Sequence, residues 1–211
     1  MSYKVKEIYY TIQGEGFHTG RTAVFCRFSG CNLWNGHEKD RKDAMCDFCD
    51  TDFIGTSGPG GGVFESAEDL VKSVQNKWPT KKSTKPFVVC TGGEPLLQMD
   101  DALVNAFHDS GFNIAVETNG TLVPPLGIDC ICVSPKINAK FILRRGNELK
   151  IVFPQADMNP KDFEKLDFEY FSIQPMDGPN LEQNIDLAVE FCLNHPHWRL
   201  SLQTHKFIGI S

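Results

Sequence analysis

Short apolar runs that end directly in polar or glycine residues recur along this chain, and they restrict the folds that it can adopt. A looser run covers residues 5–10, and the others cover residues 22–28, 86–90, 112–116, 130–133, 148–153, 169–173 and 198–203. Their β-branched and aromatic residues predict strands. Amphipathic helices are predicted over residues 66–78, 100–110 and 180–194, with Ser66 and Asn180 as N-terminal caps. The chain therefore favours an α/β fold with more strands than helices.

We interpret this order as a parallel sheet with right-handed crossovers, curled into an incomplete (β/α) barrel of about six parallel strands and few helices. An open doubly wound sheet is the competing architecture. A length of 211 residues suits a single domain, residues 1–211, with its own core. In either fold the carboxyl ends of the strands meet at one edge of the sheet, where ligands bind.

Polar residues follow the predicted strands in six places, namely residues 13–16, 91–95, 117–120, 134–136, 174–177 and 204–206. For residues 91–95, which include Gly92 and Gly93, a ligand site and a simple βα turn fit equally well. For residues 13–16 a hairpin turn is favoured. Residues 55–62 are glycine-rich and predict a loop. Arg27 interrupts an apolar strand, so it either extends to solvent or awaits an anionic ligand.

Three cysteines with unequal spacing suggest a metal centre. Cys31 is separated by fourteen residues from Cys46, and Cys49 completes a Cys-x-x-Cys pair. A structural zinc site needs four ligands, so it would have to recruit another side chain such as His37. Three thiolates can instead hold a four-iron cluster with one iron open to a substrate or cofactor. A third reading is unliganded core cysteines, and spacing alone leaves all three open.

Charge and hydropathy exclude several classes of partner. The net charge is −6 and no block of lysine or arginine occurs, which argues against a nucleic-acid surface. No apolar run approaches the roughly 18 residues of a membrane span, and the first ten residues lack the apolar core of a secretory signal. We therefore expect a cytoplasmic protein with reduced cysteines and a small-molecule partner. Buried apolar positions are expected for Cys26, Cys90, Cys130, Cys132 and Cys192.

Several sequence motifs resemble those of a known enzyme family. The set Cys31, Cys46 and Cys49, followed by GGEP at a strand end, resembles the radical S-adenosylmethionine enzymes. The segments YYTIQGEGFHTGRTAVFCRFSGCNLW, CDTDF, VETNG, VSPK, QPMDG and LQTHK are similar to those of 7-carboxy-7-deazaguanine synthases. The resemblance covers nearly the whole chain. One departure is the first cysteine gap, which has fourteen residues here and three in most of the superfamily, so the resemblance does not fix the path of residues 32–45.

The resemblance implies a particular set of cofactors. Cys31, Cys46 and Cys49 would hold a four-iron, four-sulfur (4Fe-4S) cluster whose open iron chelates the amino and carboxylate groups of S-adenosylmethionine. Asp50 and Thr51 would supply oxygen ligands to Mg²⁺. Contacts with S-adenosylmethionine are expected from Phe48, Cys49, Asp50, Gly93, Glu94, Ser134, Pro135, Lys136, Gln174, Pro175, Met176 and Asp177, with Glu94 near the methionyl ammonium.

The resemblance also implies the reaction, in which a 5′-deoxyadenosyl radical starts the ring contraction of 6-carboxy-5,6,7,8-tetrahydropterin to 7-carboxy-7-deazaguanine, with loss of ammonia. The expected substrate contacts are Ile12, Gln13, Gly14, Glu15, Arg27, Thr91, Glu117, Asn119, His205 and Ser211, with Arg27 on the substrate carboxylate and Ser211 contributing its terminal carboxylate. A flavodoxin-like electron donor and a homodimer are further expectations. The alternatives are a radical activase that acts on a glycine of a partner protein, and a non-catalytic zinc-binding module.

Overall fold

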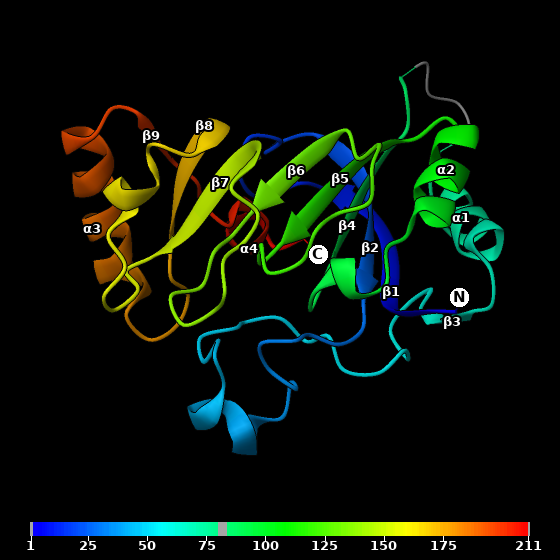
Figure 1. Cartoon of the computed structure of the whole chain (residues 1–211), viewed down its shortest axis with the longest axis horizontal. Helices are drawn as coiled ribbons and strands as arrows, with labels where there is room; N and C mark the ends of the chain where they lie inside the picture. Colours follow the sequence, from blue (N-terminus) through cyan, green and yellow to red (C-terminus); the bar gives the residue numbers. More distant parts are fainter. Residues whose placement is uncertain (1, 80–83, 211) are drawn as a thin grey trace.

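The computed structural model describes residues 2–79 and 84–210, and these residues form one continuous sheet with helices at its two ends (Figure 1). Within them the sheet has nine strands in the order β3-β1-β2-β4-β5-β6-β7-β8-β9. The strands are β1 (Tyr3–Ile12), β2 (Thr22–Phe28), β3 (Gly62–Phe64), β4 (Phe87–Gly92), β5 (Asn113–Thr118), β6 (Cys130–Val133), β7 (Arg145–Phe153), β8 (Asp167–Pro175) and β9 (Trp198–Leu200).

Most neighbouring strands run parallel. Every pair from β2 through β4 to β9 is parallel, whereas β1 pairs antiparallel with both β2 and β3. The α/β class is therefore confirmed, and the parallel part of the described sheet has seven strands rather than about six. The order places β3 and β9 at opposite edges, so the described sheet is not closed. Its form as an incomplete barrel stays a prediction.

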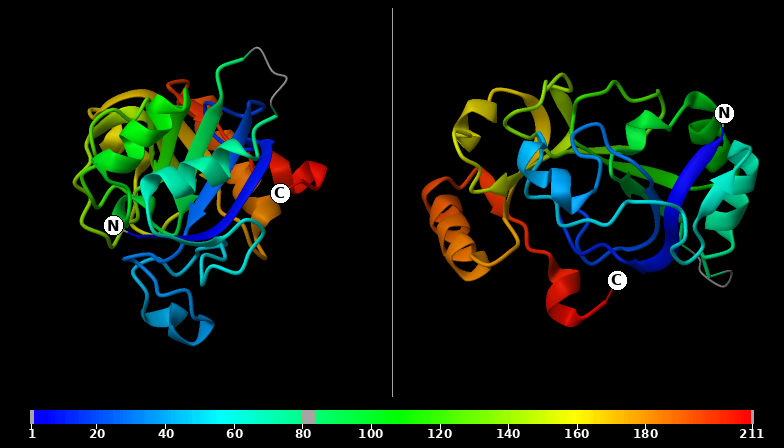
Figure 2. Two further views of the ribbon diagram at one scale, coloured as in Figure 1. Left: turned by 90° about the vertical axis from the view of Figure 1, so that its right-hand side faces the viewer. Right: turned by 90° about the horizontal axis from the view of Figure 1, so that it is seen from below.

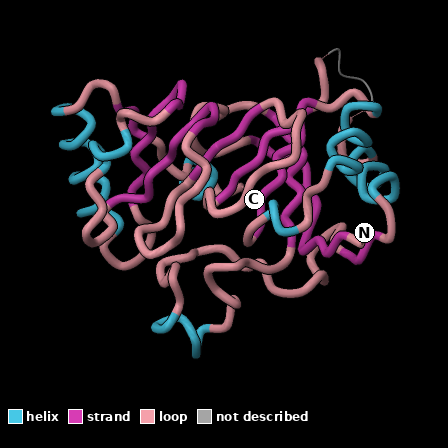
Figure 3. The backbone as a smooth tube through the Cα atoms, viewed as in Figure 1, coloured by secondary structure: helices cyan, strands magenta, loops and turns pink. Residues whose placement is uncertain are grey.

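The helices are few, as the sequence predicts. The described residues contain α1 (Ala67–Gln75), α2 (Asp101–Asp109), α3 (Leu181–Asn194) and α4 (Thr204–Ile208), together with the short 3-10 helices η1 (Glu38–Asp43), η2 (Pro95–Leu97) and η3 (Pro160–Phe163). The connections from β5 to β6 and from β6 to β7 are loops without helices (Figure 3). Among the described residues no helix combines the length and apolar character that a membrane span requires.

Two predicted segments differ from the structure. The run 198–203 was expected to be a strand, but β9 ends at Leu200 and α4 begins at Thr204. The Ser201 amide still bonds the Ile173 carbonyl at 2.8 Å, and then the chain leaves the sheet because the Thr204 amide bonds the Gly14 carbonyl at 2.9 Å. Asn180 precedes α3 as expected, but its side chain makes no capping hydrogen bond.

The glycine-rich loop lies against the edge of β1. The Gly58 amide bonds the Lys6 carbonyl at 3.0 Å, and the Ile8 amide bonds the Pro59 carbonyl at 2.8 Å. A Cβ atom on Gly58 would come within 2.6 Å of the Lys6 carbonyl oxygen, so only glycine allows this approach. The last residue of the run, Gly62, starts β3. The segment therefore covers backbone groups that an exposed edge strand would leave unpaired.

The core and the helix caps fix α1 and α2 to one end of the sheet. A large apolar cluster joins β1, β2, β4 and β5 to these two helices, and Phe107 of α2 is fully buried in it. The Ser66 hydroxyl accepts the Asp69 amide at 3.1 Å, as the sequence predicts. Asp100 accepts both the Leu103 amide at 2.9 Å and the hydroxyl of buried Tyr3 at 2.7 Å. One carboxylate therefore caps α2 and ties it to β1.

We predict that Asp100→Ala lowers the free energy of unfolding by about 1–3 kcal/mol, because the helix loses its cap and the Tyr3 hydroxyl loses its acceptor. Urea unfolding followed by circular dichroism measures this change. Asp101→Ala, at an exposed position of the same first turn, is the control. Equal losses for the two variants would contradict the role of Asp100.

Candidate active site

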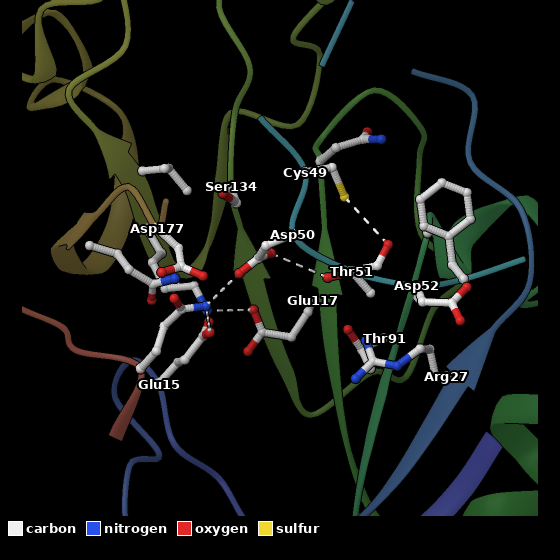
Figure 4. Close-up of a pocket in the computed structure, with 18 of the residues that line it drawn as sticks. Glu15, Arg27, Cys49, Asp50, Thr51, Asp52, Thr91, Glu117, Ser134 and Asp177 are labelled. Atoms are coloured by element: carbon white, nitrogen blue, oxygen red, sulfur yellow. Dashed lines mark hydrogen bonds and ion pairs between the residues drawn. The ribbon is translucent and has the colours of Figure 1, made fainter. Parts of the chain in front are cut away.

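A cavity of about 430 Å³ lies at the carboxyl ends of the parallel strands (Figure 4). All described residues that the sequence nominated line this cavity except Glu94 and Pro135. Ser211 lies outside the described residues. The volume is within the range of small-molecule sites, roughly 300–1,000 Å³. The structure thus brings strand ends that are far apart in the sequence to one place.

The three cysteines of the predicted metal centre line the same cavity. Cys31 follows β2, and its thiol accepts the Leu33 amide at 3.4 Å. Burial raises the pKa of Cys31, and it raises the pKa of Cys46 to about 11. Within the described part of the chain, no three His, Cys, Asp or Glu side chains are grouped to hold a single metal ion. The thiols are therefore neighbours without forming a compact mononuclear site.

A half-buried lysine lies beside these thiols. Lys136 donates to the Ser134 carbonyl at 2.8 Å and to the Ser134 hydroxyl at 2.7 Å. Burial lowers the pKa of Lys136, and the nearby groups of Cys46 and Cys49 oppose that change. Its ammonium lies 5.9 Å from the centre of the Phe48 ring. A positive charge at this position suits thiolates that bind a cluster.

The fourteen residues between Cys31 and Cys46 project from the sheet and contain η1 (Figures 1 and 2). Arg41 of η1 returns toward the cavity. Its guanidinium donates to the carbonyls of Asp47 and Cys49, both at 2.9 Å, and its central carbon lies 4.1 Å from the centre of the Trp34 ring. The insertion is thus connected to the backbone within the Cys-x-x-Cys pair.

Gly92 ends β4 and Gly93 follows it, and both glycines are explained first by packing. A Cβ atom on Gly93 would overlap the Gly30 carbonyl oxygen, and the Glu94 amide donates to that oxygen at 2.9 Å. The end of β4 therefore lies directly against the loop that carries Cys31. Gly93 also lines the cavity, so the turn and the ligand-site readings of this segment are compatible.

Glu94 lies beneath the cavity rather than in its lining. Its side chain is fully buried, and it accepts hydrogen bonds from the Leu96 amide at 2.9 Å, the Thr118 hydroxyl at 2.8 Å and the Asn119 amide at 2.8 Å. Burial raises the pKa of Glu94. The hydrogen bonds of this carboxylate are thus made within the protein, and its expected contact with the methionyl ammonium stays a prediction. It holds the end of β5, and the Asn119 side chain in turn donates to Asn32 at 2.9 Å.

The opposite wall of the cavity carries two carboxylates that share one lysine. Lys150 of β7 donates to Glu15 at 2.6 Å and to Glu117 at 3.0 Å (Figure 4 labels both carboxylates). Gln13 donates to the second oxygen of Glu117 at 3.3 Å, and Gln203 donates to the second oxygen of Glu15 at 3.0 Å. This wall is rich in hydrogen-bond acceptors held in fixed positions.

Burial and neighbouring charges act in opposite directions on the pKa values of Glu15, Glu117 and Lys150. Burial alone would raise the pKa of Glu15, but the Lys150 charge and hydrogen bonds hold it below its usual value. For Glu117 burial dominates and raises the pKa, although Lys150 acts in the opposite direction. Burial would lower the pKa of Lys150, whereas Glu117 and Glu15 raise it well above its usual value. Lys150 is therefore charged, and Glu15 is ionised at neutral pH.

Two further nominated residues have partners within the protein. The Arg27 guanidinium donates to Glu7 at 2.8 Å and to the Tyr9 hydroxyl at 3.0 Å. Asp50 accepts Lys206 at 2.6 Å and Gln203 at 3.0 Å. Burial would raise the pKa of Asp50, but these two hydrogen bonds lower it below its usual range.

Sequence reasoning missed several lining residues, chief among them Lys150, Gln203 and Lys206. A signal for Lys150 is present in the sequence, because this lysine interrupts the apolar run 148–153 as Arg27 interrupts the run 22–28. Gln203 was missed because residues 198–203 are predicted to continue as a strand, and Lys206 was included in the polar segment 204–206 without a role of its own. Lys206 joins the loop after the Cys-x-x-Cys pair to the end of β8, since it donates to Asp50 and to Asp177, each at 2.6 Å.

We predict that Glu94→Gln lowers the free energy of unfolding by about 1–3 kcal/mol, because the amide group must face a buried backbone N–H donor. The midpoint of urea unfolding measures the loss. Glu68→Gln on the exposed surface of α1 is the matched control and should change nothing. A Glu94→Gln variant as stable as the parent would show that the three hydrogen bonds do not anchor the end of β5.

Comparisons with known proteins agree with the resemblance in the motifs. No family model matches the chain. The 7-carboxy-7-deazaguanine synthases of Bradyrhizobium diazoefficiens and Burkholderia multivorans are 59% and 57% identical to it over 210 residues, and each match covers 100% of both proteins. The crystal structure of QueE from Escherichia coli superimposes with a TM-score of 0.69 at 26% identity, covering 97% of this chain and 95% of that one. Identity at this level over the full length shows that the chain is an enzyme that belongs to the 7-carboxy-7-deazaguanine synthase family.

Proposed function

We propose that the protein converts 6-carboxy-5,6,7,8-tetrahydropterin into 7-carboxy-7-deazaguanine with loss of ammonia, as a step of deazapurine biosynthesis such as that of queuosine. One observation carries the proposal. Three cysteines and an acceptor-rich wall line the same cavity, so a redox centre and a polar heterocycle can be bound side by side. The names of the most similar curated relatives support the same reaction.

The residues present fit the 4Fe-4S cluster that this chemistry requires. Cys31, Cys46 and Cys49 supply three thiolates, and an iron–sulfur cube spaces its ligands more widely than a single zinc ion does. Lys136 adds a positive charge that offsets thiolate charge. When bound, the cluster and S-adenosylmethionine supply the radical chemistry that removes one hydrogen atom from the substrate.

The protein binds S-adenosylmethionine with groups from several strand ends. The ring of Phe48 offers an apolar surface, and the backbone beside Gly93 offers uncovered polar groups. Glu94 and Pro135 act from behind the lining, Glu94 by fixing the backbone at Asn119. The remaining contacts come from Cys49, Asp50, Ser134, Lys136, Gln174, Pro175, Met176 and Asp177.

The acceptor-rich wall binds the pterin. Its planar edge carries neighbouring N–H groups, which match the carboxylates of Glu15 and Glu117 and the amides of Gln13 and Asn119. His205 lies against Gly14, where a Cβ atom would come within 2.9 Å of the His205 Cβ. Burial lowers the pKa of His205, so the ring is neutral and offers one donor and one acceptor. Ile12, Gly14 and Thr91 complete this wall.

The Arg27 guanidinium binds the substrate carboxylate. Its Glu7 and Tyr9 contacts hold the guanidinium at the cavity while the substrate supplies a second anion. These contacts would hold the reacting C–H bond in one position relative to the radical.

Asp50 and Thr51 hold Mg²⁺ through oxygen ligands. The Thr51 hydroxyl and an Asp50 oxygen are 3.5 Å apart, close enough for one cation to contact both. Lys206 occupies another position of the Asp50 carboxylate, so metal binding has to displace or share this lysine. When bound, the cation would supply positive charge for oxygen atoms of the substrate.

We further infer that the chain acts as a single catalytic domain in the cytoplasm, and as a homodimer that receives electrons from a flavodoxin-like donor. The net charge of −6 without a basic block supports the absence of a nucleic-acid partner.

The decisive test is turnover of the tetrahydropterin by anaerobically reconstituted protein with S-adenosylmethionine and reductant. We expect the parent protein to bind about four irons and to form the deazaguanine product. Cys49→Ala should be colourless and inactive, whereas Cys192→Ala, on the α3 helix, should match the parent. Normal iron content in Cys49→Ala would exclude the proposed ligand set, and a brown parent protein that leaves the pterin unchanged would exclude the reaction.

We predict that a chelator of divalent cations slows turnover at least tenfold and that added Mg²⁺ restores it, because Asp50 and Thr51 then lose the ion that bridges them to substrate. The iron content is measured in the same samples, since chelation must not remove the cluster. A rate unchanged by the chelator would remove Mg²⁺ from the proposal.

A further inference from the structure

We propose that Lys150 is a positioning residue, which holds the carboxylates of Glu15 and Glu117 as one paired acceptor for the N–H edge of a planar heterocycle. The inference deepens the proposed function and depends on it, since the heterocycle is the proposed pterin.

The geometry of the three side chains supports this role. Lys150 comes from β7, Glu117 from β5, and Glu15 from the turn that follows β1. Only about 5% of the Lys150 side chain is exposed, compared with 20% for Glu15 and 21% for Glu117. The lysine therefore lies deeper than the carboxylates that it joins, and the carboxylates are the part that a ligand meets first.

Each carboxylate gives one oxygen to Lys150 and keeps the other for an amide. The Glu15 oxygens accept Lys150 at 2.6 Å and Gln203 at 3.0 Å, and those of Glu117 accept Lys150 at 3.0 Å and Gln13 at 3.3 Å. Each oxygen of a carboxylate can accept a second hydrogen bond. Both groups are therefore fixed in orientation while they keep capacity for donors of the ligand.

The lysine also prevents the two carboxylates from repelling each other. Two like charges in one partly buried site raise the pKa of at least one of them, and a protonated carboxyl group loses acceptor capacity. Glu117 is the susceptible member because burial already raises its pKa. The cation between the two groups opposes that rise, so its removal should leave Glu117 protonated at a higher pH.

Other titratable groups around this site must be included in any pH profile. They come from β6, β7, α4 and the loops that follow Cys49 and β6, and they are Asp50, Cys132, Lys136, Glu148, His205 and Lys206. None of them donates a hydrogen bond to both carboxylates, whereas Lys150 does. A change of charge at Lys150 therefore acts on the pair more directly than a change at the other sites.

The experiment compares Lys150→Met, Lys150→Arg and the surface control Lys72→Met on α1, all as reconstituted holoenzyme. We expect Lys150→Met to raise the KM for 6-carboxy-5,6,7,8-tetrahydropterin at least tenfold and to leave the KM for S-adenosylmethionine within threefold. The acidic limb of its kcat/KM profile should move to higher pH by one unit or more, because Glu117 loses its cation. Calorimetric titration with the pterin measures the same loss of affinity without turnover.

Lys150→Arg keeps the charge, so its acidic limb should stay at the position of the parent even where its KM is raised by the different shape. If Lys150 had a purely structural role, the acidic limbs of Lys150→Arg and Lys150→Met would not differ in pH. Melting temperatures identify a variant that fails to fold, and Lys150→Gln then replaces Lys150→Met in the same measurements.

The inference is overturned if the parent converts the pterin while the folded charge-removing variant keeps its KM and its acidic limb. It is also overturned if the affinities for pterin and S-adenosylmethionine fall equally. A parent protein that does not convert the pterin at all contradicts the proposed function instead, so the two failures are distinguishable.

Discussion

The fully buried carboxylate of Glu94 is the contact on which the arrangement of the cavity depends. The backbone amide of Glu94 donates to the Gly30 carbonyl. The Glu94 side chain accepts hydrogen bonds from Leu96, just after β4, and from Thr118 and Asn119 at the end of β5. Asn119 then bonds Asn32, which follows Cys31 directly. Three neighbouring strand ends are thus joined at one group. The first thiol and the polar wall acquire their relative position before any ligand is bound.

Around this anchor, three lysines from different elements distribute positive charge among the acidic groups of the cavity. Lys136 lies beside the thiols, Lys150 joins Glu15 and Glu117, and Lys206 joins Asp50 and Asp177. Buried or half-buried anions are costly unless they are paired, and here Lys150 and Lys206 each pair with two carboxylates. The cavity can therefore carry many acceptors without expelling them to solvent.

Much of the fold was predictable from residue patterns, because buried parallel strands appear in the sequence as apolar runs. The residues that follow these runs line the cavity. The run 130–133 coincides with β6, and the run 22–28 with β2. The partners of polar side chains were not predictable, because they depend on register. Arg27 stands opposite Glu7 across the antiparallel pair of β1 and β2, and no local pattern reveals that pairing. Likewise, the end of β9 at Leu200 depends on the distant Gly14 carbonyl.

The contacts of Arg41 bear on how the protein accommodates fourteen residues between Cys31 and Cys46. Extra chain between two cysteines adds conformational entropy to the segment that has to order when a cluster assembles. Arg41 offsets this by bonding to the backbone of Asp47 and Cys49, so the loop closes on itself next to the thiol pair. The outer turn of the insertion is then free to diverge in sequence without displacing the pair. The guanidinium group of Arg41 therefore makes the position of the thiols independent of sequence changes on the solvent-facing side of the insertion.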